Sequence, residues 1–188
     1  MDDIFRCFGT GDPLMEEYHD EEWGVPVYDD RLLFEHLTLD GFQAGLSWRT
    51  VLHKRENFRS AFNGFDPERI ALYTDQDRAR LLADAGIIRN KLKINAAITN
   101  AQAYLDIMSQ PGSFSDFLWS FTDGKTVKGP RAKTWQDIPT TSPESDAMSK
   151  ALKTHGFKFV GSTICYAFMQ AVGIIDDHFV DCFRFSGR

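Results

Sequence analysis

The chain has 188 residues, of which 26% are charged, and its formal net charge is −6. No apolar run approaches the ~18 residues that a membrane-spanning helix needs, and residues 1–4 lack the basic and apolar regions of a signal peptide. The composition therefore excludes a membrane span and predicts one cytoplasmic domain with a substantial core.

The charge is distributed unevenly along the chain. Residues 1–79 carry a net charge of −9, whereas residues 80–160 carry a net charge of +4. A basic middle part is compatible with a nucleic-acid partner, because only one patch has to meet the phosphates. Ordinary surface charge explains the same distribution, so the charge alone does not decide between the two.

Helical periodicity dominates the sequence and predicts an all-α fold. The predicted helices include residues 30–38, 48–62, 74–82, 90–108 and 142–154. Cap signals mark helix starts at Asp66-Pro67, Thr74-x-x-Asp77 and Ser142-Pro143. The run 157–172 fits a buried helix, although its β-branched residues also suit a strand.

Two segments near the N-terminus combine carboxylates, large aromatic residues and glycines. They are residues 18–26, which include Tyr18 and Trp23, and residues 40–48, which run from Asp40 to Trp48. Aromatic walls with one buried acid suit a flat, cationic ring, which stacking and cation–π attraction can hold. In the alternative interpretation the tryptophans are core anchors and the aspartate is a helix N-cap.

Residues 81–94 predict two helices joined by a turn centred on Gly86, with the second helix beginning near Ile88. Arg89, Lys91 and Lys93 would surround the N-terminus of that second helix. Main-chain N–H groups and cations at such an end can grip a phosphate without reading base sequence. An ordinary helix–helix turn is the alternative.

Residues 122–141 form the one long segment without helical periodicity, and they contain two glycines and two prolines. Their basic residues are Lys125, Lys128, Arg131 and Lys133. A functional basic loop and a merely solvated loop are both compatible with this composition.

Potential zinc ligands occur as two pairs at opposite ends of the chain: Cys7 with His19, and His178 with Cys182. One tetrahedral ion that took all four would join the two ends, and a full site of this kind is structural rather than catalytic. Chance spacing and ordinary core cysteines are the alternative, and Cys165, inside an apolar run, fits packing. Three cysteines suit a reducing compartment better than a disulfide framework.

Five longer motifs occur along the chain. They are Tyr-His-Asp-x-Glu-Trp-Gly-Val-Pro at 18–26, Gln-Ala-Gly-Leu-Ser-Trp at 43–48, Lys-Arg-Glu-Asn-Phe at 54–58, Asp-Ala-Gly-Ile-Ile-Arg at 84–89 and Gly-Phe-Lys-Phe-Val-Gly-Ser-Thr-Ile-Cys-Tyr at 156–166. Strings of this length are highly specific. With them, the chain from Cys7 to Cys182 resembles the DNA-3-methyladenine glycosylase I family of bacteria.

The resemblance implies a helix-hairpin-helix DNA glycosylase fold. Residues 1–188 would form a single glycosylase domain of two helical lobes, with the hairpin at about 81–94. One structural zinc ion would join the N- and C-terminal segments. Its ligands, matched residue by residue, are Cys7, His19, His178 and Cys182.

The resemblance also assigns the binding residues. Tyr18, Trp23 and Trp48 match the aromatic base pocket, and Leu46 matches the residue presented to the gap left by the flipped nucleotide. Asp40 stands where the family typically has a glutamate, so the acid is kept but is one methylene shorter. Beside it, a phenylalanine replaces a residue that can be glutamine.

The implied reaction is the hydrolytic excision of 3-methyladenine from alkylated double-stranded DNA, bound mostly through phosphates. A methylated adenine is already positively charged, so the enzyme need not protonate it. No general base is evident. No lysine occupies an obvious nucleophile position either, which predicts a monofunctional enzyme that releases the free base without strand cleavage. We also expect the enzyme to be a monomer. The alternative is a module that recognises alkylated bases and hydrolyses nothing.

Overall fold

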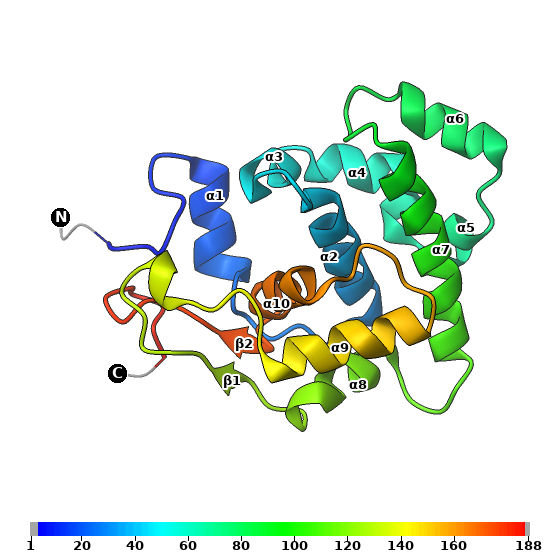
Figure 1. Cartoon of the computed structure of the whole chain (residues 1–188). Coiled ribbons are helices and arrows are strands. Elements are labelled where there is room, and N and C mark those ends of the chain that lie inside the picture. Colours follow the sequence, from blue (N-terminus) through cyan, green and yellow to red (C-terminus); the bar gives the residue numbers. More distant parts are fainter. Residues whose placement is uncertain (1–3, 187–188) are drawn as a thin grey trace.

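The computed structural model describes residues 4–186, and most of that part of the chain is helical (Figure 1). The α-helices are α1 (Pro13–Glu17), α2 (Asp30–Gln43), α3 (Trp48–Leu52), α4 (Arg55–Ala61), α5 (Pro67–Ala71), α6 (Asp75–Ala83), α7 (Lys91–Met108), α8 (Phe114–Trp119), α9 (Pro143–Thr154) and α10 (Ser162–Ala171). The shorter elements are η1 (Tyr18–Glu22), η2 (Asn63–Phe65), η3 (Ser120–Thr122), η4 (Trp135–Asp137), β1 (Val127–Lys128) and β2 (Ile175–Asp176). A predominantly helical fold, as predicted, is confirmed.

The predicted cap signals begin the helices where expected. Asp66 caps α5 through its side chain, and Thr74 forms a capping box with Asp77 at the start of α6. Ser142 caps α9, which covers the predicted residues as far as Thr154. These side chains accept hydrogen bonds from main-chain N–H groups that the first helical turn leaves unpaired, so local sequence fixes these starts.

Two expectations about the second half of the chain are confirmed only in part. The run 157–172 is helical only from Ser162, and Phe159 before it adopts a left-handed φ of 56°. The segment 122–141 contains a strand, β1, which pairs in parallel with β2. Such a two-residue ladder has no hairpin and no alternating pattern, so nothing in the sequence marks it.

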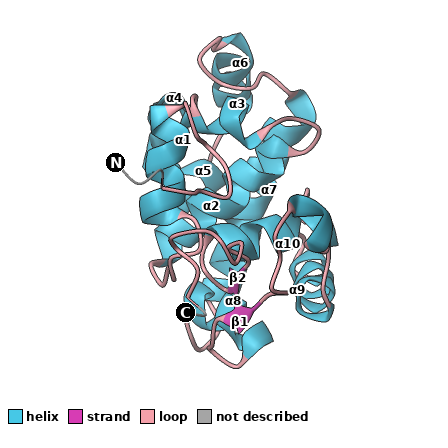
Figure 2. Cartoon of the chain, turned by 90° about the vertical axis from the view of Figure 1, so that its left-hand side faces the viewer, coloured by secondary structure: helices cyan, strands magenta, loops and turns pink. Residues whose placement is uncertain are grey.

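Helix α2 lies at the centre of the molecule. It contacts α3, α7, α8 and α10, and every residue from Leu33 to Phe42 is buried. Helices α4 to α7 gather on one side of α2 and α8 to α10 on the other, as Figures 1 and 2 show. The side chains that fill the core are chiefly large and apolar, including the fully buried Phe34, Phe42, Phe58, Phe62, Phe65, Phe114, Phe157 and Phe168.

The two ends of the described chain lie side by side (Figure 1). Phe183 donates its main-chain N–H to the carbonyl of Phe5 at 3.2 Å. A second apolar cluster forms there and includes Cys7, Trp23 and Cys182. No helix within residues 4–186 is both long and apolar enough to cross a membrane.

Candidate functional site

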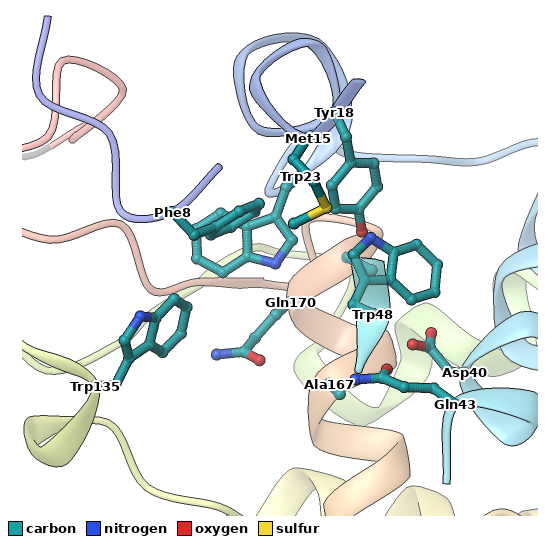
Figure 3. Close-up of a pocket in the computed structure, with 11 residues that line it drawn as sticks. Phe8, Met15, Tyr18, Trp23, Asp40, Gln43, Trp48, Trp135, Ala167 and Gln170 are labelled. Carbon is teal, nitrogen blue, oxygen red and sulfur yellow. The ribbon is translucent and has the colours of Figure 1, made fainter. Parts of the chain in front are cut away.

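A cavity of about 200 Å³ opens between α1, α2, α3 and α10 (Figure 3). Five of its lining side chains are aromatic, and one is a carboxylic acid. The lining residues are Phe8, Met15, Tyr18, Trp23, Asp40, Gln43, Trp48, Trp135, Ala167, Gln170 and Ala171. The structure thus brings together the four residues predicted for the pocket: Tyr18, Trp23, Asp40 and Trp48.

A π-helical segment, η1, builds the upper wall. The main-chain N–H of Trp23 donates to the carbonyl of Tyr18 at 2.8 Å, and both side chains are buried. Tyr18 then packs against Trp48 at the start of α3, with ring centroids 5.2 Å apart. Burial and the nearby Asp40 carboxyl raise the pKa of Tyr18 well above its usual range, so this hydroxyl keeps its proton.

Asp40 lies in the last turn of α2 and is only 2% exposed. Its Oδ2 atom has no hydrogen-bond partner among the described residues, and burial raises its pKa well above the usual range. By contrast, Glu35 on the same helix is paired with Arg59 at 2.7 Å. The alternative interpretation of Asp40 as an N-cap is wrong, because α2 begins at Asp30. A buried acid without a partner is unfavourable unless a ligand supplies one.

Several lining residues were missing from the sequence prediction. Trp135 comes from η4 in the basic loop and contacts both Phe8 and Trp23, with ring centroids about 6.1 Å apart. Gln170 on α10 donates from Nε2 to buried Asp177 at 2.7 Å. Gln43 was an available signal, because it begins the motif at 43–48, and the isolated tryptophan in the loop was another.

Leu46 occupies the turn that follows α2, three residues beyond the lining residue Gln43. Gly45 before it adopts φ of 78°, a conformation that favours glycine, and the Leu46 N–H donates to the Gln43 carbonyl at 2.6 Å. The Leu46 side chain is 43% exposed. The turn therefore leaves an apolar side chain exposed.

The turn between α6 and α7 differs in detail from the prediction. Helix α7 begins at Lys91 rather than near Ile88, because Asn90 caps it by accepting from two main-chain N–H groups at 3.0 and 3.1 Å. Gly86 does not have a left-handed φ; a Cβ atom there would instead lie 2.9 Å from Asp84 Oδ1. Its N–H donates to the same carboxylate at 2.7 Å. Gly86 therefore shapes the turn and does not offer this N–H to a phosphate.

The three cations predicted around this turn do not share one environment. Arg89 and Lys91 are exposed. Lys93 is only 8% exposed, and its Nζ donates to the main-chain carbonyls of Phe42 at 2.8 Å and Ala44 at 2.6 Å. The expectation that Lys93 faces phosphates is therefore corrected: its ammonium group is turned toward the end of α2.

Cys7, His19 and Cys182 come together although they lie at opposite ends of the chain. Their potential ligand atoms all lie within 4.8 Å of one another, and all three residues are buried. His19 Nε2 is 3.4 Å from the Cys182 sulfur. His178 is adjacent, with its ring centroid 5.4 Å from that of His19. The residues present can hold a metal ion with sulfur and imidazole ligands.

The hydrogen bonds of the Nδ1 atoms of both histidines also fit a metal site. Nδ1 of His19 lies 2.8 Å from a carboxylate oxygen of Asp20, and Nδ1 of His178 lies 2.9 Å from one of Asp176. Zinc-binding histidines commonly have such a carboxylate on the outer ring nitrogen. Nε2 of His178 is buried without a hydrogen-bond partner among the described residues. A metal ion would satisfy that atom.

A helical fold with an aromatic cavity and one unpaired buried acid fits a protein that binds a flat, cationic base. The family model described as methyladenine glycosylase matches residues 8–185, and the chain belongs to that family. The resemblance drawn from the sequence motifs is confirmed.

Individual relatives agree along nearly the whole chain. DNA-3-methyladenine glycosylase 1 of Escherichia coli is 53% identical over 184 residues, which cover 97% of this chain and 98% of that protein. A crystal structure of 3-methyladenine DNA glycosylase I matches with a TM-score of 0.93 at 54% identity, over 96% of this chain and 99% of the other. A second crystal structure, of a tyrosine-to-phenylalanine variant of 3-methyladenine DNA glycosylase I in complex with 3-methyladenine, matches with a TM-score of 0.89 at 41% identity. The match covers 94% of each chain.

Proposed function

We propose that this protein excises 3-methyladenine from alkylated DNA in base excision repair. The observation that carries the proposal is the pocket: Asp40 is buried and unpaired among aromatic rings. A cationic methylated adenine offers that acid both a positive charge and an exocyclic N–H donor. Normal adenine offers no charge, so the acid favours the damaged base.

The reaction requires little acid–base chemistry. Water adds to C1′ of the sugar, the C1′–N9 bond breaks, and its electron pair neutralises the base as it leaves; one proton of the water goes to solvent. Asp40 and Tyr18 are the titratable side chains among the described lining residues, and the lining contains no lysine. The pocket therefore holds and orients the flipped base, and the rings exclude water from it. We infer a monofunctional enzyme without strand cleavage.

We infer that α6, the turn after it and α7 form a helix-hairpin-helix that grips DNA phosphates. Arg89 and Lys91 are the exposed cations at the N-terminus of α7, where the helix dipole also favours an anion. Leu46, exposed on its turn, would fill the space left by the flipped nucleotide. One chain supplies the pocket and the hairpin, so we propose that a monomer acts on DNA. We also propose that it does so in the cytoplasm.

We also propose one structural zinc ion with Cys7, His19, His178 and Cys182 as its complete shell. Four protein ligands leave no position for a water or a substrate, so the ion would stabilise the fold and take no part in the reaction. It would hold the N-terminal segment, which carries Phe8, against the C-terminal segment. Its support is the ligand cluster and the buried, unpaired His178 nitrogen.

The proposed activity is tested by incubating the purified protein with duplex DNA treated with a methylating agent. We expect free 3-methyladenine in the soluble fraction, identified by chromatography, and an intact strand with an abasic site. A module that only recognises alkylated bases would retain the methylated DNA and release no base. Strand cleavage without added alkali would contradict a monofunctional reaction.

Lys91 provides a test of the phosphate contacts. We expect Lys91→Met to weaken binding to duplex DNA and to reduce the slope of log affinity against log salt by about one. Its affinity for free 3-methyladenine should not change, because the side chain is exposed outside the pocket. Binding isotherms at four salt concentrations measure the slope. An unaltered slope would show that Lys91 does not contact a DNA phosphate.

A further inference from the structure

Lys93 carries a buried charge that is not balanced by an acid. The residue is 8% exposed, and no carboxylate within residues 4–186 forms an ion pair with it. Burial lowers the pKa of Lys93, yet its Nζ donates two short hydrogen bonds, to the Phe42 and Ala44 carbonyls. Burying an ammonium group costs free energy, because the group loses its hydration. The hydrogen bonds to these two carbonyls must therefore offset much of that cost.

These carbonyls lie at the C-terminal end of α2, the central helix. The last carbonyls of an α-helix have no partner within it, and they form the negative end of its dipole. At α2 this end leads directly through Gly45 to Leu46. Lys93 thus joins the first turn of α7 to the turn that holds out Leu46.

We propose that Lys93 is a positioning residue that clamps the end of α2, so that Leu46 is presented when the hairpin engages DNA. The inference rests on the proposed functions of the hairpin and of Leu46. Lys91, two residues earlier on the same helix turn, is exposed and serves as the matched cation. Phosphates are held by Lys91, and the turn is held by Lys93.

The test compares Lys93→Met with Lys91→Met in three assays. For Lys93→Met we expect excision from methylated duplex DNA to fall about tenfold in kcat/KM, the effect of losing a charged hydrogen bond. Excision from methylated single-stranded DNA, where no base stack must be held open, should change less than about twofold. The salt slope should stay at the parent value, whereas Lys91→Met lowers it. A lowered slope in Lys93→Met would overturn the proposal, because it would identify a phosphate contact.

A double-mutant cycle with Leu46→Ala separates this inference from the function on which it rests. If the clamp acts through Leu46, the variant carrying both Lys93→Met and Leu46→Ala should lose no more duplex activity than Leu46→Ala alone. Additive losses overturn the clamp. Normal duplex activity in Leu46→Ala contradicts the proposed function of Leu46 itself, and the clamp with it.

Loss of folding must not be mistaken for loss of the clamp. Free 3-methyladenine affinity should be unchanged in Lys93→Met, and near-UV circular dichroism checks its packing. Lys93→Gln, which keeps an N–H donor, is measured in the same assays, and it replaces Lys93→Met where that variant does not fold. We expect Lys93→Gln to retain more duplex activity than any variant without a donor; an equal loss in the folded Lys93→Gln and Lys93→Met proteins would overturn the proposal.

Discussion

Asp40→Asn is expected to reduce excision of 3-methyladenine on the order of 100-fold, because the pocket keeps its shape and loses its charge. The amide cannot neutralise the cationic base, and one of its two polar atoms becomes a donor that faces the exocyclic amino group. Discrimination between 3-methyladenine and adenine should fall with the rate. Single-turnover excision and titration with the two free bases measure both quantities.

Two matched variants accompany Asp40→Asn. Asp40→Glu should keep activity, since it restores the acid that is typical of the family and adds one methylene of reach. Trp48→Ala should weaken the binding of 3-methyladenine and of adenine together, because stacking on the ring does not depend on the charge of the base. If Asp40→Asn excises 3-methyladenine as fast as the parent, the recognition acid lies elsewhere.

The pH dependence provides a second readout of Asp40. Burial raises its pKa, so the free enzyme holds this proton to a higher pH than an exposed aspartate does. Recognition of the cation needs the carboxylate, so kcat/KM of the parent should rise with pH as the proton is lost. The Asp40→Asn profile should lack this rise.

The stability of Asp40→Asn should change in the opposite direction to its activity. A raised pKa means that the fold retains a proton which the unfolded chain releases, so this acid destabilises the fold increasingly above the unfolded pKa. Asparagine carries no such cost. The melting temperature at neutral pH should therefore equal or exceed that of the parent, which also excludes misfolding as the reason for lost activity.

Among the variants proposed for this protein, Cys182→Ala is expected to lose the most thermal stability. Apparent binding free energies of structural zinc are about 10 kcal/mol or more, comparable with the whole stability of a domain. Removing one thiolate from the proposed shell should therefore lower the melting temperature sharply and reduce the metal content below one ion per chain. A chelator should lower the melting temperature of the parent toward that of the variant.

Cys165→Ala is the matched control, since Cys165 is also buried but its sulfur donates to the Val160 carbonyl, away from the ligand cluster. We expect it to cost only about 1–2 kcal/mol through lost packing and to leave the metal content unchanged. Elemental analysis of natively purified protein decides the matter. No bound metal, together with melting that a chelator does not alter, would remove the zinc proposal.

Much of the site was predictable because its residues are adjacent in sequence. Tyr18 and Trp23 are joined by one turn of η1, and the stretch from Asp40 to Trp48 crosses a single helix end. The gathering of Cys7 with Cys182 was predictable from ligand chemistry, although not from spacing. Trp135 and Gln170 could not be assigned to the pocket, because their positions depend on how η4 packs against Phe8 and Trp23 and how α10 packs against α2.

The sequence by itself determined the elements whose causes are local: the capped helix starts, the apolar helix faces and the turn at Gly45. It also carried the motifs that identify the family. Only the tertiary structure decided that Lys91 faces solvent while Lys93 points into the end of α2. Lysines have the same charge and the same helix propensity at both positions. What separates them is a pair of carbonyls contributed by a helix some 50 residues earlier in the chain, and desolvation of an ammonium group is tolerated only where such acceptors are already in place.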